Sequence, residues 1–448
     1  MKKRIFQFAF VACLALGMSS QVNAQIFTNA SGDGLWSNAA NWDNGVVPTG
    51  ADDVVLGDEN NTGVTANFDL AAASVNDFRI GSGVGTLGAS GTFNQSSGTL
   101  TANGWSFVGS DANPANSGPT AGTFNLSGNA QFINNLAGNE FHVGIGGGAG
   151  ATGSGVVNVS DTATLSSHNI RIGSNDGNSG TLNVSGGLVE ANFDGNSFLT
   201  VGSGSATGLV NQSAGTVASN NWITIGEGAG SSGEYNLSGG ALTTSNLTVG
   251  QADAGTTGEL NVSGSSSVTA DSLWVGRGEF GGAGATGLLE IVGSNATVLA
   301  NGDVHFGGFN FAAADAVGDL SFIADAFGVT TLDIAGSLFL NDGSGVGASN
   351  LLVDLTADAN FGTFGTTGTA FEYLLVDNFN NGVTGEFAGL AEGASISIGG
   401  GLTGTISYVG GDGNDIVINL FTTAVPEPSA VLIASLGMLG LMTRRRRS

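Results

Sequence analysis

The chain has 448 residues, of which 41% are hydrophobic and only 10% are charged, the reverse of the composition of a disordered chain. Its 78 glycines and five prolines predict many tight turns between apolar segments. Outside the two termini there are three arginines, no lysine and 35 acidic residues, so the body has a net charge of 3 minus 35, or −32. This charge excludes binding to nucleic acid or to anionic membranes through phosphate. The acidity favours solubility outside the cell, with weak binding of divalent cations as the alternative.

Residues 1–24 have the organisation of a secretory signal peptide. A cluster of basic residues follows the initial methionine, an apolar segment comes next, and Ala24 provides a small residue before the predicted cleavage. The alternatives are a membrane anchor, for which the apolar segment is short, and lipidation at Cys13. Cleavage after Ala24 would leave a mature chain without cysteine and therefore without disulfides.

Residues 25–75 are predicted to cap the first coil of the repeats that follow. They contain the segment WSNAANWDNGVVP, in which Trp36, Trp42 and Pro48 could cover apolar side chains and unpaired strand edges. The functional alternative is a sugar-binding platform made of Trp36 and Trp42.

Residues 76–309 are a repeat in which two short motifs alternate. The first motif is Gly-x-apolar-Asn-x-Ser, and the second is apolar-x-apolar-Gly. Successive copies of the first motif lie 25 to 33 residues apart. This period predicts one coil of a parallel β-helix with two or three short strands, whereas propeller blades repeat at about 40 to 50 residues. Helical repeats would need long segments with a period of 3.6 residues.

The second motif predicts which side chains point into the helix. The residues one and three positions before its glycine, such as Ile225 and Ile223, are nearly all apolar and share one face of a strand. The residue between them should point outward. This outward column consists of Arg79, Phe107, His142, Arg171, Thr200, Thr224, Thr248, Trp274 and His305.

The asparagine of the first motif recurs in seven coils. We predict that stacked side-chain amides form a structural ladder along the helix axis. Each copy is also an Asn-x-Ser glycosylation sequence, which is the alternative explanation. The predicted ladder consists of Asn94, Asn125, Asn158, Asn183, Asn211, Asn236 and Asn261.

No arrangement of residues predicts catalysis. His142 and His305 should lie about 29 Å apart in the outward column, and His168 precedes a strand, so no metal or catalytic cluster is expected. A polysaccharide lyase would need cations, and the body offers only scattered arginines. A hydrolase could use paired carboxylates. We therefore expect no enzymatic activity and no cofactor.

Residues 310–424 are predicted to form irregular β coils or a closing β-sheet, because their repeat fades while strand-like segments persist. The segment GGDGNDIV matches a calcium-binding nonapeptide pattern once, with Asp412 and Asp415 as weak candidate ligands. Because such sites form between successive copies, a glycine turn is the preferred interpretation.

Residues 425–448 begin with Val425-Pro426-Glu427-Pro428, continue with a short apolar segment and end with the basic cluster Arg444 to Arg447. They resemble the PEP-CTERM sorting signal of bacterial secreted proteins. The resemblance implies a processing enzyme of the exosortase type as partner, and transient insertion of the short apolar helix in the membrane, with a permanent tail anchor as the alternative. The residues that carry it are Val425, Pro426, Glu427, Pro428, Arg444, Arg445, Arg446 and Arg447.

The body is similar to the autotransporter-like, glycine-rich β-solenoid proteins, through the Trp36–Pro48 segment and the closing ISYVGGDGNDIVI. Residues and resemblance together predict an all-β protein, a right-handed parallel β-helix. They also predict a secreted structural or adhesive protein of the cell surface or extracellular matrix, without catalytic activity. The alternative is a β-helix that binds or degrades polysaccharide, with an exopolysaccharide as candidate partner.

Overall fold

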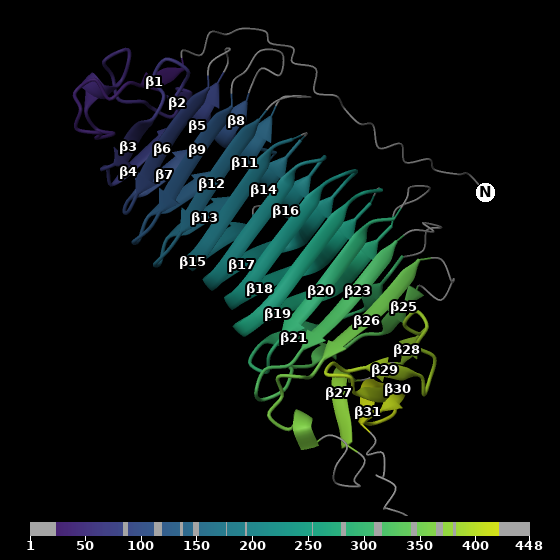
Figure 1. Ribbon diagram of the computed structural model, residues 1–448. Helices are drawn as coiled ribbons and strands as arrows, with labels where there is room; N and C mark the ends of the chain where they lie inside the picture. Colours follow the sequence, from purple (N-terminus) through teal and green to yellow (C-terminus); the bar gives the residue numbers. More distant parts are fainter. Residues whose placement is uncertain are drawn as a thin grey trace, which may run out of the picture.

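The computed structural model describes residues 24–420, except 84–87, 112–118, 135–137, 147–151, 176, 193–194, 253, 279–283, 309–315, 342–346, 364–370 and 380–381. The predicted signal peptide and sorting segment lie outside these residues. The described chain forms an elongated β-solenoid with the N-terminal coils at one end and a small antiparallel sheet at the other (Figure 1). Apart from strands it contains short 3₁₀ turns such as η1 (Ala39–Asn41) and η3 (Phe361–Thr363).

Parallel pairing between successive coils builds three stacks of strands. The first stack contains the Gly-x-apolar-Asn-x-Ser motif. Its separate strands are β3 (Val64–Phe68), β6 (Ala89–Gln95), β9 (Thr120–Leu126), β12 (Gly153–Val159), β20 (Thr286–Val292), β23 (Val317–Ile323) and β26 (Ala348–Asp354).

The second stack is narrower and lies between the two motifs. Its separate strands are β4 (Ala72–Val75), β7 (Thr99–Ala102), β10 (Gln131–Asn134), β13 (Thr164–Ser167), β21 (Thr297–Ala300) and β24 (Leu332–Ile334).

The third stack contains the apolar-x-apolar-Gly motif. Its separate strands are β1 (Gln25–Phe27), β2 (Val54–Leu56), β5 (Phe78–Gly83), β8 (Ser106–Asp111), β11 (Glu140–Gly146), β14 (Asn169–Ser174), β16 (Phe198–Ser203), β22 (Val304–Phe306), β25 (Leu338–Leu340) and β28 (Val383–Thr384).

In the middle of the solenoid the strands continue around the corners and join two or three stacks. These long strands are β15 (Ser179–Ala191), β17 (Thr207–Glu227), β18 (Ser232–Gln251) and β19 (Thr257–Arg277). The register keeps each motif aligned from coil to coil: Asn211 pairs with Asn236, and Ile225 pairs with Val249. The repeat in the sequence is therefore a repeat in space.

The coils extend on both sides of the predicted repeat region 76–309. Strands β1 to β4 already belong to the stacks, so the segment 25–75 contains coil strands as well as the end cover. Beyond residue 310, β23 and β26 continue the first stack in parallel.

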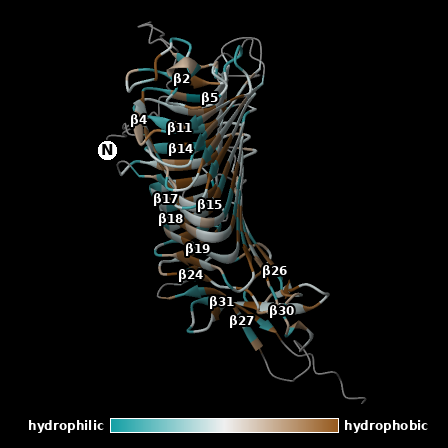
Figure 2. Cartoon of the chain, turned by 90° about the vertical axis from the view of Figure 1, so that its left-hand side faces the viewer, coloured by the Kyte–Doolittle hydropathy of each residue, from teal (hydrophilic) through white to brown (hydrophobic). Residues whose placement is uncertain are grey.

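An antiparallel sheet follows the last coils. It is formed by β27 (Phe371–Asn378), β29 (Ser395–Ser397), β30 (Thr403–Gly410) and β31 (Asp415–Leu420). Strand β27 also pairs in parallel with β24, so it joins this sheet to the second stack. Figure 2 shows these strands below the stacked coils.

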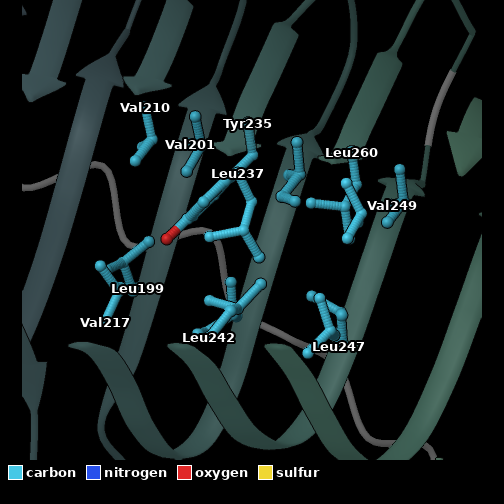
Figure 3. Close-up of a cluster of buried hydrophobic side chains, with 14 of the residues drawn as sticks. Leu199, Val201, Val210, Val217, Tyr235, Leu237, Leu242, Leu247, Val249 and Leu260 are labelled. Atoms are coloured by element: carbon cyan, nitrogen blue, oxygen red, sulfur yellow. The ribbon is translucent and has the colours of Figure 1, made fainter. Parts of the chain in front are cut away.

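The core is a continuous apolar column along the axis of the solenoid. Side chains from all three stacks meet there, and Figure 3 shows Leu199, Val201, Val217 and Leu242 converging around Tyr235. Full burial of one such aliphatic side chain stabilises the fold by about 1.5–3 kcal/mol. One polar pair inside this column is hydrogen-bonded: the hydroxyl of Tyr235 donates to Oε1 of Gln212, whose Nε2 donates to the carbonyl of Gly215.

Aromatic side chains fill the N-terminal end of this column. Trp36 is fully buried and its ring lies 4.8 Å from that of Trp42 and 5.5 Å from that of Phe93, centre to centre. The indole N–H of Trp42 donates to the carbonyl of Trp36 at 2.9 Å. Because both indoles are buried, they cover the end of the core and do not present the sugar platform considered as an alternative.

Glycines of the two motifs let the backbone turn and pack without a gap. Gly226 has a φ of 76°, and a Cβ added there would overlap the carbonyl oxygen of Thr257. A Cβ on Gly258, in the first motif, would overlap the backbone at Gly250. Each corner glycine thus meets the glycine region of another coil, which explains why both motifs retain this residue.

Candidate functional site

The outer face of the third stack carries aromatic, basic and acidic side chains close together. The central outward position in each coil is the outward column predicted from sequence. Its side chains point away from the core, but pointing outward does not leave most of them exposed. Five are buried, namely His142, Thr200, Thr224, Thr248 and His305. Side chains two positions earlier in the strands share this face, and large groups from neighbouring coils cover one another there.

The N-terminal part of this face is a stack of flat side chains. The rings of Trp105 and Phe107 lie 6.1 Å apart and nearly parallel, and each is 5.6 Å from the ring of His142. The guanidinium of Arg79 lies 5.0 Å from the ring centre of Phe107 and forms an ion pair with Asp77 at 2.8 Å. Such cation–π contacts stabilise by about 0.5–1 kcal/mol at exposed sites.

Glu140 connects this stack to Arg171. Its Oε2 lies 2.7 Å from Nε of Arg171 and 3.0 Å from Nε2 of His142. Burial acts to raise the pKa of Glu140, but the hydrogen bond with His142 and the charge of Arg171 outweigh it and lower this pKa to about 2. Burial also lowers the pKa of His142, against the attraction of Glu140. At neutral pH the cluster is therefore a carboxylate–guanidinium pair beside a neutral imidazole.

Another group of stacked flat side chains covers the C-terminal part of the same face. The rings of Trp222 and Trp274 lie 5.4 Å apart, Trp274 is 6.2 Å from His305, and His305 is 4.6 Å from Phe339. The guanidinium of Arg277 lies 5.2 Å from the ring of Trp222 and 5.5 Å from that of Trp274. All three arginines of the body therefore lie on this one face, each against an aromatic ring.

Between these two groups of stacked aromatic side chains, the outward column contains only threonine. Thr200, Thr224 and Thr248 occupy three successive coils between Arg171 and Trp274. A cavity of about 300 Å³ lies over the first two threonines. We call it the threonine slot; its lining is Arg171, Phe198, Thr200, Trp222, Thr224, Glu227, Gln251 and Arg277.

The seven predicted asparagines form one hydrogen-bonded series on the first stack. In each pair, Nδ2 of one asparagine donates to Oδ1 of the asparagine in the preceding coil, at 2.7 to 3.2 Å. The series begins one coil earlier than predicted, because Asn94 donates to Asn67 at 2.9 Å. Sequence reasoning missed Asn67 because no glycine motif surrounds it. An amide nitrogen that donates within the ladder is occupied, which disfavours a sugar attached there.

The other predicted site residues do not come together. His142 and His305 both lie on the third stack of strands but belong to different groups of stacked rings, and His168 lies before β14. The described residues contain no group of three or more His, Cys, Asp or Glu side chains that could hold a metal ion. Asp412 lies on the turn between β30 and β31, while Oδ1 of Asp415 accepts from the backbone N–H of Asn378 at 2.9 Å. This segment is thus a hairpin turn.

The aromatic stacks could have been found in the sequence. Trp105, Phe198 and Trp222 stand two residues before the outward column in their coils, so strand periodicity places them on the same face. What the sequence did not reveal is how far these large side chains reach over neighbouring coils. No helix in the described segments is long and apolar enough to span a bilayer.

The C-terminal segment indicates how the cell exports, sorts and processes the chain. Residues 424–447 match the family model of the PEP-CTERM protein-sorting motif, which confirms the predicted sorting signal. The motif indicates an exported protein that is sorted to the cell envelope and processed by an exosortase-type enzyme. Fold and motif together define an exported β-solenoid protein with a sorting tail. Neither the curated proteins nor the solved structures gave a match to the chain.

Proposed function

We propose that this protein is a structural or adhesive component of the cell surface or extracellular matrix, without catalytic activity. The observation that carries the proposal is the sorting motif at the end of a chain whose body is a long β-solenoid. A solenoid presents long, regular outer faces while its stability comes from contacts between neighbouring coils. Such a body is suited to spacing and contact outside the cell.

The proposal includes the route to the surface. The N-terminal segment acts as a signal peptide and is removed near Gln25. The short apolar segment before Arg444 then holds the chain in the membrane until the processing enzyme releases it near Pro426. About 20 apolar residues are needed for a stable spanning helix, so a shorter segment suits a temporary stop. We also propose that the coil is right-handed, as in other parallel β-connections.

The absence of catalysis is supported by the chemistry of the outer faces. The arginines that a lyase would need are held by aromatic rings and carboxylates, and Arg171 is shared between Glu140 and Glu227. The body charge of −32 would also repel acidic polysaccharides.

Two strains of the native host test the proposal. One lacks the gene, and the other encodes a chain that ends at Thr423. We expect both to lose the protein from the cell surface and to show reduced adhesion or altered biofilm texture, while the parent strain keeps both properties. Normal adhesion in the deletion strain would contradict the adhesive role.

A separate assay addresses catalysis. The purified protein is incubated with acidic and neutral polysaccharides, with and without calcium, and reducing ends or unsaturated products are measured. We expect none. Product release that a single Asp or Glu substitution abolishes would replace this proposal with an enzymatic one.

A further inference from the structure

We propose that the threonine slot binds a segment of neutral polysaccharide. This inference deepens the proposed adhesive function and rests on it for the setting outside the cell. Large flat side chains cover the third stack of strands before and after the slot. Between these two groups of rings, Thr200 and Thr224 leave a cavity of about 300 Å³. Sites for small ligands begin at about this volume.

One wall of the slot is aromatic and rigid. Phe198 and Trp222 are register partners in adjacent coils and come two residues before the two threonines, so all four side chains point to the same side. The guanidinium of Arg171 lies 4.5 Å from the ring centre of Phe198, and that of Arg277 lies 5.2 Å from that of Trp222. The rings thus hold two planar groups of N–H donors at the edge of the cavity.

The other wall provides groups of complementary polarity. Glu227 and Gln251 are register partners in adjacent coils, and the Glu227 side chain is 39% exposed. A carboxylate accepts hydrogen bonds from hydroxyl groups, and a side-chain amide both donates and accepts. Together with the arginines and the rings of Phe198 and Trp222, these groups give the slot donors, acceptors and apolar ring surface within one cavity. Pyranose rings present this same combination, with hydroxyl groups at the rim and C–H groups on the faces.

Charge favours a neutral ligand over an acidic one. Arg171 already faces two carboxylates, with Glu140 at 2.7 Å and Glu227 at 3.8 Å. The slot lining has two guanidiniums and one carboxylate, and Glu140, just outside the lining, pairs with Arg171 and brings the charge of the four groups to zero. The body around it has a net charge of −32, which repels uronate polymers and polyphosphates.

The direction of the slot suits a polymer. Phe198 and Trp222 succeed one another along the solenoid axis, where successive coils lie about 4.8 Å apart. This spacing is close to the length of one sugar residue in an extended chain. A polysaccharide lying along the axis could therefore place consecutive sugars over consecutive coils.

Calorimetric titration of the purified full chain tests the inference. The probes are neutral hexasaccharides of glucose, mannose, galactose and xylose, and a hexauronate of equal length. We expect at least one neutral probe to bind and the hexauronate to bind at least tenfold more weakly. Thr224→Phe fills the cavity and continues the aromatic stack, so it should weaken neutral binding at least tenfold while thermal unfolding is unchanged or shifted upward.

Matched variants separate binding from folding. Arg79→Gln removes a cation held by an aromatic ring on the same face but outside the slot, and should leave binding unchanged. Glu227→Ala shortens a partly exposed lining side chain and should weaken binding even if Thr224→Phe does not fold. Absence of neutral binding, preference for the hexauronate, or equal binding by wild type and both slot variants would overturn the inference. If sugar binding is lost while sorting and adhesion are normal, the proposed function stands and only the binding inference fails. If sorting fails while sugar binding is intact, the proposed function fails and the binding inference stands.

Discussion

Asn183 shows how one side chain connects two coils. Its Nδ2 donates to Oδ1 of Asn158 at 2.8 Å, and its Oδ1 accepts from Asn211 at 3.0 Å. Each inner member of the series uses a donor and an acceptor on two separate atoms, and a side-chain amide supplies both without charge. This requirement explains the repeated asparagine without invoking glycosylation.

Asn183→Asp keeps the shape of the side chain and removes the donor. At pH 7 the carboxylate would face Oδ1 of Asn158, and we expect a loss of about 1–3 kcal/mol in the free energy of unfolding relative to wild type. The protonated acid can donate again, so its folded pKa should be raised. The loss should therefore be largest above the folded pKa and shrink below the unfolded value of about 3.9. Urea denaturation of both proteins at pH 7 and pH 3 measures this difference.

Asn44→Asp is the control for this substitution. Asn44 is exposed and uses Oδ1 to accept from the N–H of Val46 at 3.0 Å, a role that a carboxylate retains. We expect a change below about 0.5 kcal/mol. A similar loss in both variants would show that added negative charge, and not the ladder, is responsible.

Glu140 gives the folded state a dependence on pH. Its pKa is lowered to about 2, so the ionised form is stabilised by folding. This contribution is fully present above the unfolded pKa and is lost as the pH falls toward 2. Glu140→Gln should therefore cost about 2 kcal/mol at pH 7 and much less near pH 2, in denaturant titrations referred to wild type. Asp412→Asn, on an exposed turn, should cost less than about 0.5 kcal/mol at either pH, and equal costs for both variants would contradict this account.

At the scale of the strand and its turn, glycine decides whether coils can stack. Gly226 and Gly228 both have positive φ values, 76° and 82°. A Cβ on Gly226 would overlap the Thr257 carbonyl, whereas a Cβ on Gly228 would meet nothing closer than 3.8 Å. Conformational strain is thus common to both positions, and the packing conflict is confined to Gly226.

Paired alanine variants separate these two effects. Gly228→Ala should lower the free energy of unfolding by about 1–2 kcal/mol through backbone strain alone. Gly226→Ala should cost about 3 kcal/mol or more, because the coil must also shift. Equal losses in a denaturant titration would mean that the corner glycines are kept for conformation and not for close packing.

The same scale shows what could be predicted from the sequence. Period-two patterning placed Ile223 and Ile225 inside, and both are fully buried. Burial of Thr224 could not be predicted, because it lies in a slot whose other lining residues, among them Arg171 and Arg277, come largely from neighbouring coils. The sequence does not predict strand β1 as a coil strand, because it lacks the glycine motif and joins the third stack through pairing with β2.

For the whole molecule, we propose that both ends of the chain are targeting signals and that the solenoid between them acts outside the cell. The sorting motif at 424–447 supports export and processing, and the body lies between the two predicted cleavage points. The predicted slot ligand and adhesive role both presuppose this location.

Intact-mass measurement of the protein recovered from the extracellular or surface fraction of its native host tests the claim most directly. We predict a chain that begins near Gln25 and ends near Pro426, with any covalent attachment adding to that mass. A surface form that still carries Arg444–Arg447, or a chain found only inside the cell with both ends intact, would contradict the account.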